Sequence, residues 1–325
     1  MKEKIILSWI LLFSVNFAFN LSILMAQSSI KDLSFKKIDA SDGLSSNETK
    51  KVFRDSEGYL WVFAEGVFNK YDGYSFTRYP VLEDNTSWKG LTVYDISESS
   101  DQEILLATSH GMVTLKKEFD HFAFVALNTD QEKQPIKKLI TDKNNAIWAI
   151  GNRIFRYDKK GEFLPLTESI TNETVTSAAY DEANHQILVG TGAGKIFFYN
   201  ILNNQLTDSI IPEQPLLSGN IQKQGIRDMY FEKATGILWT AVASGDLKKI
   251  DTKNHVTETI NLSDTLEQGN HITTLFNYND TSLWVGTATE GILVINKNFN
   301  TVDAWFTHSL QNPDGISGNE IMDLN

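Results

Sequence analysis

The stretch that decides the fold of this 325-residue chain is VFRDSEGYLWVFAEGVFNKYDGYSFTRY, residues Val52–Tyr79. It contains four short runs rich in β-branched and aromatic residues, separated by turns that carry Asp, Ser and Gly. Runs of this length and composition, bounded by such turns, are typical of an antiparallel β-meander. We therefore expect four strands here, with Trp61 in the second of them.

The same pattern recurs along the chain at intervals of 40 to 51 residues. In each copy the second strand carries Trp or Leu at one position: Trp61, Leu105, Trp148, Leu188, Trp239 and Trp284. A unit of about 45 residues with four strands is the size of a β-propeller blade. One such sheet cannot bury both of its faces alone, so blades must stack around an axis. We predict an all-β propeller over residues 34–325, with the six Trp and Leu positions packed as core between blades.

The end of the chain repeats its beginning. DGISGNE at residues 314–320 matches DGLSSNE at residues 42–48, which opens the first copy. We therefore expect six complete blades plus the first strand of a seventh, with Ser34–Ile38 as a fourth strand that precedes the first copy. The two middle strands of the seventh blade would be missing, which favours a fragment. An open strand edge is a template for pairing, so we expect self-association.

DGLSSNE and the stretch VFRDSEGYLWVFAEGVFNKYDGYSFTRY, together with LWVGT at Leu283–Thr287, resemble the two-component regulator propeller repeat. The resemblance covers the chain from about residue 34 to its end. It implies the N-terminal part of the periplasmic sensor region of a Bacteroidetes-type hybrid two-component sensor histidine kinase. In that family seven-bladed propellers precede membrane, kinase, receiver and DNA-binding parts, which this sequence lacks. The resemblance implies an oligosaccharide ligand, the missing membrane and kinase parts as partners, and a homodimer in the full-length context.

The N-terminus predicts export. Lys2 and Lys4 precede an apolar stretch, Ile5–Met25, which ends at Ala26. This order is that of a secretory signal, so we expect residues 1–26 to be a signal peptide cleaved before Gln27. The alternative is an uncleaved membrane anchor of about 20 residues. Either way the propeller is expected in the periplasm or on the periplasmic face of the inner membrane.

Composition narrows the classes of function. The net charge of −12 disfavours nucleic acid and anionic lipid as partners. The absence of cysteine excludes disulfides, cysteine-ligated zinc and a thiol nucleophile. The six histidines show no metal-ligand spacing, and VGTGAGKIFF at Val189–Phe198 departs from a phosphate-binding loop. We predict no catalytic residue, no metal, no cofactor and no enzymatic activity for this chain.

Candidate ligand-binding residues lie on the loops that join the fourth strand of one blade to the next first strand. In a propeller these loops share a face with those joining second and third strands. The candidates carry groups suited to sugar hydroxyls, carboxylates or ring stacking: Trp88, Lys89, Asn220, Gln222, Gln224, Arg227 and His271. The alternative for each is a loop that folds onto its own blade. Two other functions stay open, a secreted propeller enzyme acting on polysaccharide and a non-catalytic interaction scaffold.

Overall fold

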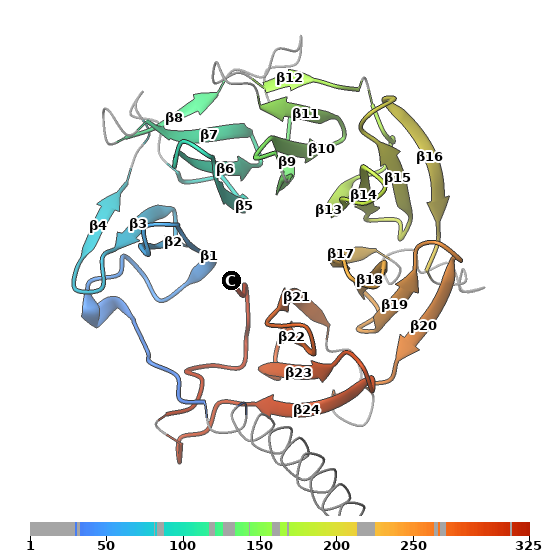
Figure 1. The fold of residues 1–325 in the computed structure, drawn as a ribbon. Helices are drawn as coiled ribbons and strands as arrows, with labels where there is room; N and C mark the ends of the chain where they lie inside the picture. Colours follow the sequence, from blue (N-terminus) through green and yellow to red (C-terminus); the bar gives the residue numbers. More distant parts are fainter. Residues whose placement is uncertain are drawn as a thin grey trace, which may run out of the picture.

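A computed structural model describes residues 30, 33–80, 82, 88–116, 121–125, 134–142, 144–157, 163–167, 169–212, 225–262, 266, 271–312 and 314–325. Their strands form six four-stranded antiparallel sheets, which stand in a ring around a central axis (Figure 1). The predicted all-β propeller is confirmed. The predicted signal peptide, residues 1–26, lies outside the described residues. Within the described ranges no helix is long and apolar enough to span a membrane.

Each blade is a run of four consecutive strands. A short 3-10 helix, η1 (Ala40–Asp42), precedes the first blade. The first three blades comprise β1 (Thr49–Arg54), β2 (Leu60–Ala64), β3 (Val67–Tyr71), β4 (Phe76–Tyr79), β5 (Val93–Glu98), β6 (Ile104–Thr108), β7 (Gly111–Lys116), β8 (His121–Val125), β9 (Ile136–Thr141), β10 (Ile147–Gly151), β11 (Ile154–Tyr157) and β12 (Phe163–Pro165). The other three comprise β13 (Val175–Asp181), β14 (Gln186–Thr191), β15 (Ile196–Asn200), β16 (Gln205–Ile210), β17 (Ile226–Glu232), β18 (Ile237–Val242), β19 (Leu247–Asp251), β20 (Val256–Ile260), β21 (Ile272–Asn277), β22 (Ser282–Thr287), β23 (Ile292–Asn296) and β24 (Thr301–Phe306).

The first strand of every blade lies nearest the axis and the fourth lies at the outside (Figure 1). The second strands β6 and β10 are buried along their whole length, since neighbouring blades cover both faces. This is why their sequences are continuous apolar runs rather than alternating ones. The outer strands β16 and β20 are largely exposed, and their sequences are correspondingly polar.

The core lies between the blades. The predicted core positions Trp61, Leu105, Trp148, Leu188, Trp239 and Trp284 are all buried, with exposed fractions from 0 to 8%. Trp61, for example, packs against Phe68 of its own blade and against Phe122 of the second blade. Each blade-to-blade junction thus has its own apolar cluster, and the recurring Trp or Leu is part of it.

Two of the tryptophans are tied to the preceding turn. The Trp61 indole N–H donates to Asp55 at 2.8 Å, and that of Trp148 donates to Asp142 at 3.2 Å. Asp55 also accepts the backbone N–H of Tyr59, so one carboxylate both closes the turn and satisfies the buried indole. A buried N–H without such a partner would cost free energy.

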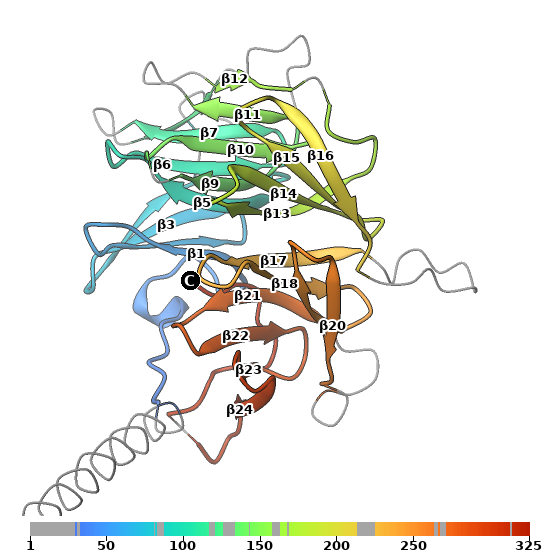
Figure 2. The ribbon, with the colours of Figure 1, turned by 45° about the vertical axis from the view of Figure 1, so that its right-hand side comes forward.

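The C-terminal segment, residues 319–325, takes the innermost position of a seventh blade. On one side the Ile321 N–H donates to the Thr287 carbonyl at 2.9 Å. On the other side the Val52 N–H of β1 donates to Asp323 at 3.0 Å. Figures 1 and 2 both place the end of the chain at the axis beside β1. The segment forms no regular strand, but its position is the one predicted from the repeated DGISGNE sequence.

The N-terminal segment, residues 33–39, lies at the outer side of the same position. The Phe35 N–H donates to the Asp314 carbonyl at 2.8 Å, and the rings of Phe35 and Phe306 are 5.1 Å apart. A cavity of about 830 Å³ separates this segment from residues 319–325. Among the described residues no strand occupies that space. The prediction of six complete blades is confirmed, whereas the strands expected for a seventh blade at Ser34–Ile38 and at the end of the chain are not formed.

Candidate functional site

A β-bulge interrupts each of the six innermost strands at the same register. In every case one residue near the start of the strand has no partner on the second strand: Lys50, Tyr94, Lys137, Thr176, Arg227 and Thr273. A bulge re-aims the extra side chain and bends the strand. Because the six strands surround the axis, the six bulge residues form a layer around it. We call them the bulge layer.

The bulge layer borders a polar cavity of about 140 Å³ at the axis. All of its members except Lys50 line this cavity, together with the residues that follow them in sequence. The bulges come at the starts of the innermost strands, so they belong to the face that carries the loops between blades. On this face the Ala288 N–H of a turn between second and third strands donates to the His271 carbonyl at 3.0 Å.

The residues that follow the bulges form a second layer. We call it the aspartate layer: Lys51, Asp95, Lys138, Ser177, Asp228, Thr274 and, from the C-terminal segment, Asp323. Its three carboxylates each accept a backbone N–H from the next innermost strand around the ring. The donors are Leu139 to Asp95 at 2.8 Å, Leu275 to Asp228 at 2.8 Å, and Val52 to Asp323 at 3.0 Å. The aspartates therefore join neighbouring blades at the axis.

Two lysines, Lys51 and Lys138, and two hydroxyl residues, Ser177 and Thr274, complete the aspartate layer. Lys51 pairs with Asp323 at 2.8 Å, and Lys138 lies 3.5 Å from Asp95. Asp95, with smaller contributions from Asp228 and Asp323, holds the pKa of Lys138 well above its usual range. Burial raises the pKa of Asp323, and the neighbouring Lys51 opposes this shift. All three carboxylates of the layer thus already have protein partners.

The bulge layer is positively charged, whereas the aspartate layer contains carboxylates. It contains three cations, Lys50, Lys137 and Arg227, and no carboxylate. The Lys137 ammonium lies 3.5 Å from the centre of the Tyr94 ring, which is a close cation–π contact. Lys137 and Arg227 line the axial cavity, so this layer places two positive charges there in a chain of net charge −12.

Of the predicted ligand-binding residues, the structure places Arg227 in the axial cavity. Lys89 is exposed on the loop before β5, and His271 is half-buried at the start of β21. Asn220, Gln222 and Gln224 lie outside the described residues. Lys50, Tyr94 and Lys137 were not among the predicted residues. Alignment of the first strands of all copies would have placed these residues in the same column as Arg227.

Trp88, a predicted ligand-binding residue, is not accessible to a ligand. Its side chain is fully buried, and its indole N–H donates to the Tyr79 carbonyl at 2.7 Å. The ring stacks on Phe68 and packs edge-on against Phe122, between the first two blades. The loop folds inward because this aromatic cluster buries a large apolar area and offers the indole N–H a partner. Trp88 therefore presents no face to a ligand in solvent.

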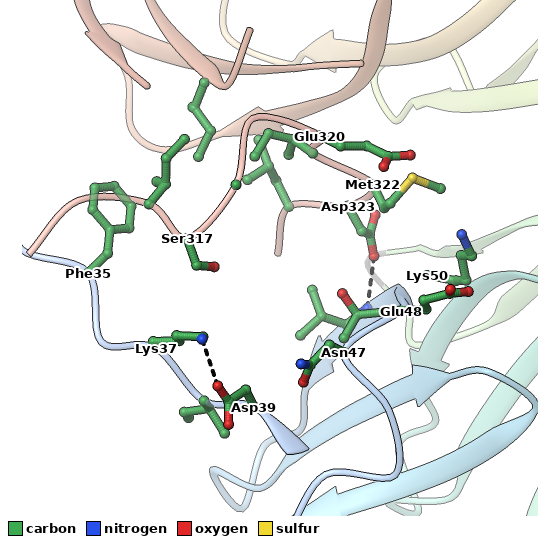
Figure 3. A pocket seen from close by; sticks show the side chains of 18 of the residues that line it. Phe35, Lys37, Asp39, Asn47, Glu48, Lys50, Ser317, Glu320, Met322 and Asp323 are labelled. Atoms are coloured by element: carbon green, nitrogen blue, oxygen red, sulfur yellow. Dashed lines mark hydrogen bonds and ion pairs between the residues drawn. The ribbon is translucent and has the colours of Figure 1, made fainter. Parts of the chain in front are cut away.

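The larger cavity is the space of the seventh blade. Figure 3 shows its lining, with Lys37 paired to Asp39 at 2.7 Å on the N-terminal side and Asp323 facing the first blade. Trp284 and Ile292 of the sixth blade form part of its wall. The Trp284 indole N–H has no hydrogen-bond partner among the described residues. The cavity is thus a gap in the ring, with walls that elsewhere in the propeller are covered by a neighbouring blade.

The other two features considered in the sequence are possible metal ligands and the glycine-containing stretch Val189–Phe198. No group of three or more His, Asp or Glu in the described part of the chain could hold a metal ion. The stretch Val189–Phe198 is the hairpin of β14 and β15, with Gly194 in its turn. The predicted absence of catalytic residues and cofactors stays a prediction.

Comparisons with known proteins give the class of fold. No family model and no curated protein sequence matches the chain. Among solved structures it is similar to the extracellular domain of the hybrid two-component system BT3049 from B. thetaiotaomicron, with 17% identity, a TM-score of 0.69, and coverage of 90% of this chain and 39% of that chain. The corresponding domain of BT4673 from the same organism gives 18% identity, a TM-score of 0.67, and coverage of 89% and 37%.

A further neighbour is virginiamycin B lyase from Staphylococcus aureus, with 14% identity, a TM-score of 0.60, and coverage of 78% of this chain and 83% of that chain. At such identities the likeness shows the fold, which is a β-propeller. Three of the structural neighbours are extracellular domains of one- or two-component systems, and the sequence resembles the two-component regulator propeller repeat. The chain spans less than two fifths of the length of these sensor structures.

Proposed function

We propose that this chain is the extracytoplasmic, non-catalytic sensing propeller of a two-component signalling protein. The observation that carries the proposal is the match of about nine tenths of the chain to extracellular domains of two-component systems. The Lys-rich start followed by an apolar stretch supports export. In this proposal, the signal passes to membrane and kinase parts of the same system, and pairing of two copies in the full-length protein is part of that transmission.

An oligosaccharide is the proposed ligand, bound on the face that carries the loops between blades. The axial cavity on this face offers an aromatic ring, Tyr94, and the hydrogen-bond donors Lys137 and Arg227. Aromatic rings and a few convergent polar groups are the usual lining of small-molecule sites.

The state of the axial carboxylates favours a binding role over hydrolysis or elimination. A general base must be free to take a proton from the substrate. Asp95, Asp228 and Asp323 each accept a backbone N–H from the next blade. Protonation of any of them would weaken a contact that joins neighbouring blades.

The test combines location, binding and turnover. The full chain is expressed in a Gram-negative host, and the periplasmic protein is expected to begin at Gln27 by mass spectrometry. Titration calorimetry against a panel of oligosaccharides should detect binding, and chromatography should recover each saccharide unchanged. Conversion of a saccharide to product would instead show an enzyme. Retention in the cytoplasm, or binding of none of the panel, would contradict the sensing proposal.

A further inference from the structure

We propose that the bulge layer is an anion site, at which Lys137 and Arg227 bind a carboxylate group of the ligand at the mouth of the axial cavity. The inference deepens the proposed sensing function and rests on it for the source of the carboxylate, an acidic saccharide.

The six bulges share one register. Six innermost strands with different sequences carry a bulge at one position, and in five of them the bulge residue lines the axial cavity. A single bulge could reflect a local packing need. The shared position brings bulge side chains from five blades to one cavity, and bulges are over-represented next to active sites.

Charge is separated along the axis. The aspartate layer has its carboxylates directed to backbone N–H groups of neighbouring strands and to Lys51 and Lys138. Lys137 and Arg227, one residue nearer the mouth, form no ion pair within the described part of the chain. Their donors are therefore available to an anion. Arg presents a planar fork that matches a carboxylate with two parallel hydrogen bonds.

The axial cavity is small. A cavity of about 140 Å³ has room for roughly four to five water molecules at the liquid volume of ~30 Å³ each. One carboxylate with its neighbouring carbons fits such a space, but a sugar ring with its substituents does not. The acid group would enter the mouth end-on, and the rest of the ligand would lie above it among the loops. Tyr94, already under the Lys137 ammonium, fixes one of the two cations.

The experiment is titration calorimetry of the full chain with digalacturonate, with neutral digalactose as its matched probe and with succinate as a carboxylate that is not a sugar. Variants are Arg227→Gln and Lys137→Gln. The control is Arg153→Gln, which removes the same charge from a turn on the same face but outside the axial cavity. Thermal melts of every variant establish that the fold is intact.

We expect digalacturonate to bind, with affinity that falls about tenfold or more in Arg227→Gln and in Lys137→Gln, because each loses a charge-assisted hydrogen bond. Arg153→Gln should stay within about twofold of the parent, and added salt should weaken binding. Binding of succinate but not of digalacturonate, with the same variant effects, would support the anion site while contradicting the saccharide ligand. No binding of either acid, or equal binding by parent and both axial variants, would overturn the inference.

Discussion

The comparison of Trp239→Ala with Trp284→Ala tests whether the seventh position of the ring is filled in solution. Both residues occupy the same place in their blades, but their surroundings differ. Trp239 is completely buried in the cluster between the fifth and sixth blades. Trp284 retains an 8% exposed fraction, stacks on Tyr278 and lines the 830 Å³ gap.

The difference in surroundings sets the magnitudes. Truncation of Trp239 leaves a closed cavity, so Trp239→Ala should lower the free energy of unfolding by about 3–5 kcal/mol. The void left by Trp284→Ala would join a gap that is already open, so little cavity energy is added. Its cost is then close to the burial term alone, roughly 2 kcal/mol. For a domain of this size each kcal/mol shifts the melting temperature by about 2–4 °C.

The measurement is chemical and thermal unfolding of the parent and both variants, followed by circular dichroism, with light scattering to establish the oligomeric state. If Trp284→Ala cost as much as Trp239→Ala, the reasoning from an open gap would be refuted. Light scattering would then show whether a second copy packs against the sixth blade. A monomer with equal costs would mean that residues 33–39 and 319–325 close over Trp284 in solution.

Three further predictions concern groups that the ring holds in place. Asp323→Ala removes the acceptor for the Val52 N–H, so it should destabilise the protein by about 1–3 kcal/mol and make residues 319–325 sensitive to protease. Asp323→Asn keeps an acceptor and should have a smaller effect. Equal protease resistance of Asp323→Ala and the parent would contradict the role of Asp323. Asp55→Ala leaves the buried Trp61 indole N–H unsatisfied and should cost about 1–3 kcal/mol in denaturant unfolding, and a cost near zero would show that water replaces the carboxylate. Burial, with nearby acidic groups, raises the pKa of Tyr230 to about 12. The stability that its neutral form contributes is therefore present below about pH 10 and is lost as the pH rises towards 12. Tyr230→Phe should remove this part of the loss, and an ultraviolet titration of the variant should lack one late-ionising tyrosine.

The sequence was informative where the structure is local and repeated. A blade is a meander of consecutive strands, so its period and its buried second strand appear directly in the sequence, as with Trp61 and Trp148. The match of DGISGNE to DGLSSNE placed residues 319–325 at the innermost position for the same reason. Burial of Trp88 was not predictable in this way, because the loop around it follows no period. Its position depends on the space left between two blades.

The axial site was predicted only through Arg227, because the other candidates were sought in the loops between blades, whereas Tyr94 and Lys137 lie within the innermost strands. Tyr94 and Lys137 are ordinary residues of apolar strands until the bulges are known. Which backbone N–H each carboxylate accepts depends on the relative positions of two neighbouring strands along the axis. The sequence of one strand does not give this relative position.

Closure of the ring and construction of the axial site involve the same residues. Asp323 joins the C-terminal segment to β1 and pairs with Lys51, whose neighbour in sequence, Lys50, belongs to the bulge layer. In the C-terminal segment Met322 stands at the bulge position and Asp323 at the aspartate position, so the seventh place is represented in both layers. If residues 319–325 left the axis, Lys51 would lose its carboxylate and the mouth would gain a positive charge. The charge of the anion site therefore depends on what occupies the seventh position, and an anion that binds the more positive mouth more tightly would favour release of residues 319–325 over the closed ring.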